Sequence, residues 1–103
     1  NAAQHYTTDA VSCAVYRDLC ESNDIPVQVF TNRSDTRGGS TLGNVSNAHV
    51  SLNTVDIGLA QLAMHSCYET VGARDTKYLV EAMTIFYSKT FRVDAGGSFE
   101  LLD

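Results

Sequence analysis

The residues best suited to metal chemistry in this chain of 103 amino acids are its three histidines, His5, His49 and His65. Neutral imidazole suits zinc, cobalt and manganese. His65 lies seven residues after Gly58 on an apolar connector that follows an expected strand, where open α/β sheets place ligand-contacting groups. If residues 65–69 are helical, His65 and Glu69 share a face and could both reach a metal ion.

Other interpretations of His65 stay open from the residues alone. A histidine beside Leu62 and Met64 is more often a packed core residue than a ligand, and Met64 itself is typical core filler. A catalytic zinc needs three protein ligands and an open position, but the chain contains no HExxH motif. The sequence therefore does not supply a complete metal site by itself.

A glycine-rich segment over residues 35–41 is the second candidate site. It follows an expected strand and opens an expected helix, a geometry in which backbone amides and the helix dipole hold an anion or a carboxylate. The segment lacks the lysine of a P-loop and the GxGxxG pattern of dinucleotide sites. The competing interpretation is a connector whose glycines only permit tight turns.

Asp56 and the cysteines complete the set of chemically capable residues. Asp56 interrupts an apolar strand, and we interpret it as a structural carboxylate that accepts hydrogen bonds from loop amides rather than one that orients a ligand. Cys13 and Cys20 are too far apart along a helix for a disulfide, so the cysteines are expected to be reduced packing residues of a cytosolic protein.

Two helices with clear apolar periodicity frame these candidates. Val11, Ala14, Val15 and Leu19 predict a helix that ends near residue 21, with Thr8 as its N-cap. A second amphipathic helix is predicted over residues 76–88, with Asp75 as its N-cap.

The elements nearest the candidate sites are shorter. Strands are expected over residues 27–31 and 54–57, and a short helix is expected to begin near Thr41. The tail over residues 94–103 is expected to be a short strand or a loose end.

The alternation of helices and strands favours an α/β fold with parallel strands and crossover helices. The chain is expected to be one unit over residues 1–103 without an internal boundary, but two strands bury too little to stand alone. A net charge of −5 argues against a nucleic-acid partner, and no apolar run is long enough to cross a membrane.

Three segments together resemble one protein family. They are residues 1–8, with the pattern N-A-x-Q-x-Y-x-T, residues 32–43, and residues 54–66, which contain Ala-Met-His-Ser. They are similar to the C-terminal part of the aminopeptidase I and aspartyl aminopeptidase family of dinuclear metallopeptidases. The resemblance covers nearly all of the chain.

The resemblance implies a fold and a site. The chain would be the C-terminal part of a three-layer α/β/α zinc-peptidase catalytic domain in a cytoplasmic homo-oligomer. His65 would be the last ligand of a site with two Zn²⁺ ions, Co²⁺ or Mn²⁺ being alternatives. The substrate pocket would be lined by Gly38, Gly39, Ser40, Thr41, Ala3 and Met64.

The same resemblance implies what the chain lacks. The other metal ligands and the glutamate general base of the family come from segments outside these 103 residues, so no catalytic residue is assigned here and the chain alone is expected to be inactive. The parent would release N-terminal amino acids from peptides by two-metal hydrolysis.

Two departures from the family pattern bear on this prediction. Acidic-selective members carry a lysine where Ala3 stands, so we expect a preference for neutral or hydrophobic N-terminal residues. Ala60 stands where members usually have proline. The alternative function is a non-enzymatic α/β module that binds an anion through residues 38–41.

Overall fold

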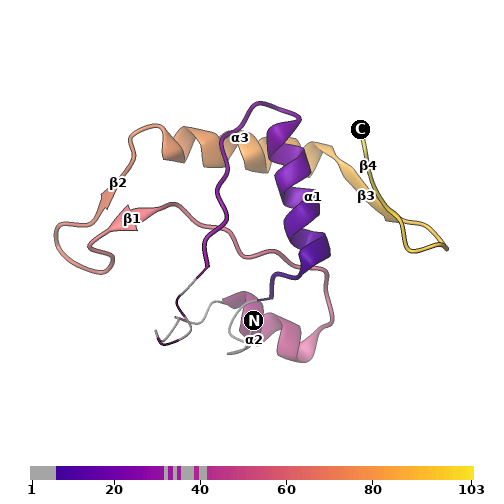
Figure 1. Cartoon of the computed structure of the whole chain (residues 1–103), viewed down its shortest axis with the longest axis horizontal. Coiled ribbons are helices and arrows are strands. Elements are labelled where there is room, and N and C mark those ends of the chain that lie inside the picture. Colours follow the sequence, from indigo (N-terminus) through magenta and orange to yellow (C-terminus); the bar gives the residue numbers. More distant parts are fainter. Residues whose placement is uncertain (1–6, 32, 34, 36–38, 40–41) are drawn as a thin grey trace.

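The computed structural model describes residues 7–31, 33, 35, 39 and 42–103. Two hairpins project from opposite ends of a central arrangement of helices (Figure 1). Each hairpin is a separate two-stranded antiparallel sheet. The elements in chain order are α1 (Ala10–Glu21), α2 (Leu42–His49), β1 (Gln61–Leu62), β2 (Thr70–Val71), α3 (Asp75–Ser88), β3 (Thr90–Val93) and β4 (Phe99–Leu102).

Helix α1 begins in a capping box. The Asp9 carboxylate accepts a hydrogen bond from the Ser12 amide at 2.7 Å, and the Ser12 hydroxyl accepts one from the Asp9 amide at 3.0 Å. The bond from the Ser12 backbone holds the pKa of Asp9 below its ordinary value. The prediction that Thr8 is the N-cap was therefore wrong by one residue. The Thr8 hydroxyl instead accepts a hydrogen bond from the Asp56 amide at 2.7 Å.

Helix α1 ends in a Schellman arrangement. The Ile25 amide donates to the Cys20 carbonyl at 2.9 Å, and the Asp24 amide donates to the Glu21 carbonyl at 3.3 Å. Asp24 takes the left-handed conformation that this motif requires, with a φ of 55°. The turn brings Ile25 back against the helix, where it is buried.

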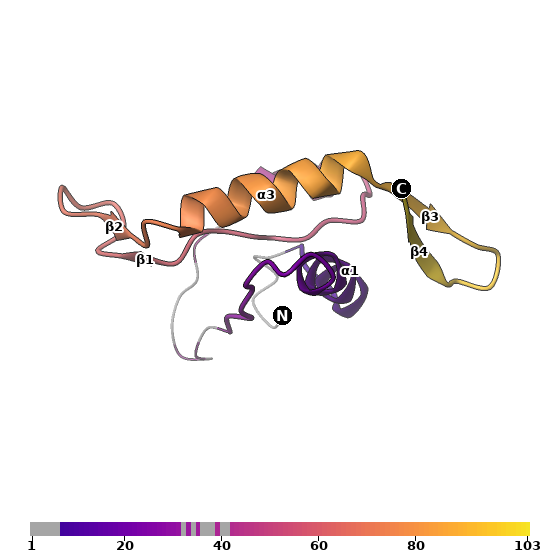
Figure 2. The same cartoon turned by 90° about the horizontal axis from the view of Figure 1, so that it is seen from above.

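A small core lies where α1 crosses α3 (Figure 2). Its buried residues are Leu19, Cys20, Ile25 and Ala82, and Tyr16, Val27, Tyr78, Ile85 and Leu101 pack against them. Burial raises the pKa of the Cys20 thiol. All three cysteines are free, as the sequence predicts, and Cys20 is a packing residue. The expectation that the cysteines are packing residues is wrong for Cys67, which is exposed.

The two other predicted helices are confirmed. Helix α2 begins directly after the glycine-rich segment, and α3 covers the predicted range. The prediction that Asp75 is the N-cap of α3 was wrong by one residue: the N-cap is Arg74, which makes no side-chain capping bond, and Asp75 is the first helical residue.

The tail forms a regular hairpin, β3–β4, rather than a loose end. Asp94 closes its turn, because its Oδ1 accepts hydrogen bonds from the amides of Gly96 at 2.8 Å and Ser98 at 2.9 Å. Gly97 takes a φ of 81°, which suits glycine. Phe91 and Phe99 stack on one face of the hairpin with ring centroids 5.3 Å apart.

The expected strands over residues 27–31 and 54–57 do not form, and the described residues contain no parallel pair. A strand needs a neighbour to pair with its backbone groups, and apolar alternation in the sequence does not reveal whether one is present. Residues 51–60 instead run alongside α3 (Figures 1 and 2).

The chain leaves much apolar surface uncovered. Its accessible surface is 8314 Å², whereas a compact monomer of this mass exposes about 5,700 Å². Its radius of gyration is 15.2 Å, against about 13 Å for a compact domain of this length. Phe30, for example, is 83% exposed. This surface agrees with the expectation that the chain buries too little to stand alone.

Among the described residues, none of the helices has both the length and the apolar character needed to span a bilayer.

Candidate functional site

His65 lies at the tip of the β1–β2 hairpin. The strands pair Gln61 with Val71 and Leu62 with Thr70, so residues 63–69 form the tip. These residues make a sequence of turns, not the helix that would place His65 and Glu69 on one face. His65 and Glu69 therefore lie in one turn of the hairpin, not on one face of a helix.

The backbone of the tip is held in an uncommon conformation. Ala63 and His65 both take left-handed φ values, 54° and 68°. For residues with a Cβ atom this conformation costs roughly 1–2 kcal/mol each. The Ser66 amide donates to the Ala63 carbonyl at 3.0 Å and closes the turn between them. Such conformations persist where the surroundings enforce them, and they cluster at functional sites.

Side chains of the tip supply part of that enforcement. The Glu69 Oε1 atom accepts a hydrogen bond from the His65 amide at 2.6 Å. The Ser66 hydroxyl accepts one from the Tyr68 amide at 3.0 Å. The sequence pointed to Glu69 as a neighbour of His65 but missed this backbone contact, which only the turn makes available.

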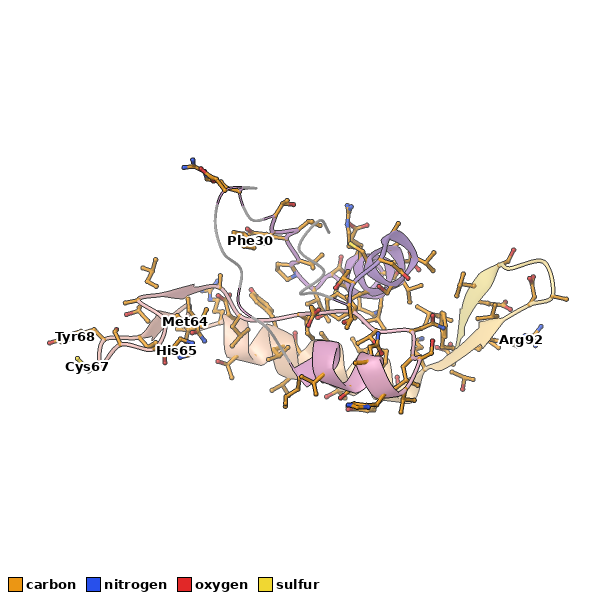
Figure 3. All side chains as sticks on the ribbon, turned by 90° about the horizontal axis from the view of Figure 1, so that it is seen from below. Phe30, Met64, His65, Cys67, Tyr68 and Arg92 are labelled. Atoms are coloured by element: carbon orange, nitrogen blue, oxygen red, sulfur yellow. The ribbon has the colours of Figure 1, made fainter. Side chains whose placement is uncertain are left out.

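The tip is open to its surroundings. Figure 3 shows Met64, His65, Cys67 and Tyr68 on the β1–β2 hairpin, with Cys67 and Tyr68 at its outer end. All four are exposed, and the exposed fractions of Met64 and Tyr68 are 59% and 83%. The interpretation of His65 and Met64 as packed core residues is therefore wrong for this chain.

The donor chemistry fits zinc only in part. The imidazole of His65 is a suitable zinc ligand, but the described part of the chain contains no group of three or more histidine, cysteine, aspartate or glutamate side chains that could hold a metal. His49 belongs to α2, and His5 lies outside the described residues. Within the described part, the tip thus offers one ligand and needs others from elsewhere.

Only residues 35 and 39 of the second candidate site, the glycine-rich segment 35–41, are among the described residues. Gly38, Ser40, Thr41 and Ala3 lie outside the described residues. Gly39 has open space around it, since a Cβ atom there would meet nothing within 4 Å. Helix α2 begins at Leu42, so the helix predicted after the segment is confirmed, whereas the strand expected before it does not form.

Asp56 has the structural role that the sequence favours. Its Oδ2 atom accepts hydrogen bonds from the amide and the hydroxyl of Thr7, at 2.8 Å and 3.1 Å. These contacts, with the bond from the Asp56 amide to Thr8, tie the segment before α1 to the segment that leads to the hairpin tip.

One groove of about 400 Å³ lies elsewhere, between α1 and the β3–β4 hairpin. Its walls are mostly apolar, with Asp18 and Glu100 as the charged residues, and include none of the residues predicted for the metal or substrate site.

Comparison with known proteins shows that this chain is similar to the members of one family. The model of the aminopeptidase I zinc metalloprotease family, M18, matches residues 1–87. Among curated relatives, the proteins named probable M18 family aminopeptidase 2 in Clostridium novyi and in Clostridium acetobutylicum are each 47% identical to this chain. The matches cover 84% and 85% of it. The corresponding protein of Ectopseudomonas mendocina is 43% identical over 85% of the chain.

The chain spans about 20% of the length of these relatives. No solved structure matches it significantly. The family match ends before the β3–β4 hairpin and includes the whole of the β1–β2 hairpin with His65. The chain therefore belongs to the aminopeptidase I zinc metalloprotease family, M18.

Proposed function

We propose that this chain is the C-terminal segment of the catalytic domain of a zinc aminopeptidase that releases N-terminal amino acids from peptides. The observation that carries the proposal is the exposed imidazole of His65, presented on a constrained hairpin tip within the part of the chain that matches the family. A ligand presented in this way suits a site completed by other segments.

The proposed fold explains the open surface. In a three-layer α/β/α domain, residues 27–31 and 54–57 would be strands paired with neighbours from outside these 103 residues. The exposed side chains of Phe30 and Leu52, 83% and 60%, would then be covered by the rest of the domain. Residues 1–103 would remain one unit of that domain.

In the proposed mechanism this chain positions groups and binds substrate. His65 would donate its imidazole to one metal ion, and Glu69 would hold the backbone from which that imidazole projects. Met64, Ala3 and the loop of Gly38, Gly39, Ser40 and Thr41 would contact the N-terminal residue of the peptide. Two Zn²⁺ ions, or Co²⁺ or Mn²⁺ in their place, would polarise the scissile carbonyl and activate water. The general base lies outside this chain.

Specificity would follow from the absence of a cation near the substrate side chain. With Ala3 at a position that a lysine could occupy, a substrate carboxylate would find no partner there, and neutral or hydrophobic N-terminal residues would be preferred. The setting we propose is a cytoplasmic homo-oligomer.

The test is the activity of the complete gene product on leucyl and aspartyl chromogenic substrates. We expect faster turnover of the leucyl substrate, loss of activity on chelation and recovery when zinc is added back. The 103-residue chain alone should show no turnover with zinc or cobalt. Chelator-resistant turnover would contradict the zinc mechanism. Phosphate binding by this chain without metal, together with no peptidase activity in the complete gene product, would instead favour the anion-binding module.

A further inference from the structure

We propose that Glu69 is a positioning residue for His65, which acts by accepting the hydrogen bond of the His65 amide and not by binding metal. The contact is short, 2.6 Å between the amide nitrogen and Oε1, and a charged acceptor shortens hydrogen bonds of this kind. This inference rests on the proposed role of His65 as a zinc ligand.

The local structure explains why the tip needs this contact. Each strand of the β1–β2 hairpin has two residues, and two-stranded hairpins are marginally stable by themselves. Ala63 and His65 add the cost of left-handed backbone without glycine. The bond from Glu69 offsets that cost at the residue whose side chain must be presented.

The same contact gives Glu69 a role at the tip that needs no bond to metal. Its Oε1 atom accepts a hydrogen bond from the backbone amide of the residue that carries the imidazole. A residue that fixes the backbone of a ligand restricts where the imidazole can lie, and groups that orient ligands contribute about 10–100-fold to metal affinity. Glu69 therefore sets the geometry of the tip.

The test compares Glu69→Ala and Glu69→Gln in the complete gene product. The glutamine retains an oxygen acceptor and the alanine has none. We expect Glu69→Ala to weaken zinc binding, measured by competition with a chelator, by about 10–100-fold. Glu69→Gln should stay within about threefold of the unmodified protein, because the neutral acceptor still makes the bond, although more weakly. The matched control is Glu81→Ala, which removes a carboxylate from α3 and should leave affinity unchanged.

A second measurement on the metal-free protein keeps the two proposals distinguishable. Hydrogen exchange of the His65 amide should be faster in Glu69→Ala than in Glu69→Gln, whatever binds at the tip. If exchange behaves so but neither Glu69→Ala nor His65→Ala changes zinc affinity, the proposed zinc site is wrong and the positioning role toward it falls with it. If His65→Ala abolishes zinc binding while Glu69→Ala does not weaken it, or if Glu69→Gln is as damaging as Glu69→Ala, only the positioning role is overturned.

Discussion

The crossing of α1 and α3 and the tip of the β1–β2 hairpin are built on opposite principles. At the crossing, Leu19 and Ala82 are buried, and both ends of α1 are closed by regular capping motifs. At the tip the residues are exposed and two of them take left-handed backbone without being glycine. Burial at the crossing stabilises the chain, whereas the left-handed backbone at the tip, which includes His65, is destabilising.

A matched pair of leucine truncations tests most strongly whether the crossing, and not the hairpin, stabilises the fold. Leu19→Ala should lower the free energy of unfolding by about 2–4 kcal/mol, because Leu19 is 2% exposed and the truncation leaves a cavity. Leu62→Ala, in β1, should change it by less than about 0.5 kcal/mol, since Leu62 is 72% exposed. Denaturant unfolding of the complete gene product carrying each substitution gives both values.

Equal losses in the two variants would mean that the hairpin is part of the stabilising core. If other segments of the complete gene product cover Leu62, its truncation should cost more than the small loss expected for an exposed leucine. The size of the Leu62→Ala effect therefore also reports how much of the hairpin the rest of the domain buries.

Glycine substitutions in and beside the β1–β2 hairpin should test, with a smaller effect, whether the backbone of the tip is strained. Ala63→Gly should raise the free energy of unfolding by about 0.5–1 kcal/mol, because glycine takes a φ of 54° without steric cost. Ala60→Gly, nearby but without a positive φ, should lower it by about 0.5 kcal/mol. Loss of stability in both variants would show that Ala63 is not strained.

The last effect, confined to alkaline pH, is the pH dependence of the crossing. Burial, with a hydrogen bond to Cys20, raises the pKa of Tyr16 from 10.0 to about 12. The folded state therefore retains this proton more strongly than the unfolded state, so the contribution is complete below pH 10 and is lost as the pH rises from 10 towards 12. Tyr16→Phe should flatten this part of a stability profile measured by thermal unfolding. An unchanged slope would show that Tyr16 is not the group responsible.

The helices could be predicted from the sequence because their apolar spacing reports directly on the face that they bury. Val15 and Leu19 in α1, and Ala82 and Ile85 in α3, recur at helical intervals, and all three predicted helices form. The caps were less predictable. Thr8, Asp9 and Ser12 all have side chains that can cap, and the contact between Thr8 and Asp56 decided which residue does.

The strands and the site could not be predicted to the same depth. Residues 54–57 have a strand pattern, but pairing depends on neighbours that a local pattern does not contain. The resemblance to the family pointed to His65 as the candidate ligand, and that assignment remains a prediction. Its left-handed backbone and its bond to Glu69 arise from the turn, which neither periodicity nor spacing indicated.

The β3–β4 hairpin adds a further lesson. It lies beyond the matched residues, and its turn can be explained from Asp94 and Gly97 alone. The tail over residues 94–103 was expected to be a short strand or a loose end, and the first alternative is confirmed by β4. The pairing of β4 with β3, in which Phe91 and Val93 share one face, was not predicted.

The central claim is that His65 binds zinc, and the zinc content of the complete gene product tests it most directly. His49 provides the matched control, because it is an exposed histidine at the end of α2. We predict that His65→Ala loses zinc on dialysis while His49→Ala retains the zinc content of the unmodified protein. Equal zinc content in the unmodified protein and in His65→Ala would contradict the account.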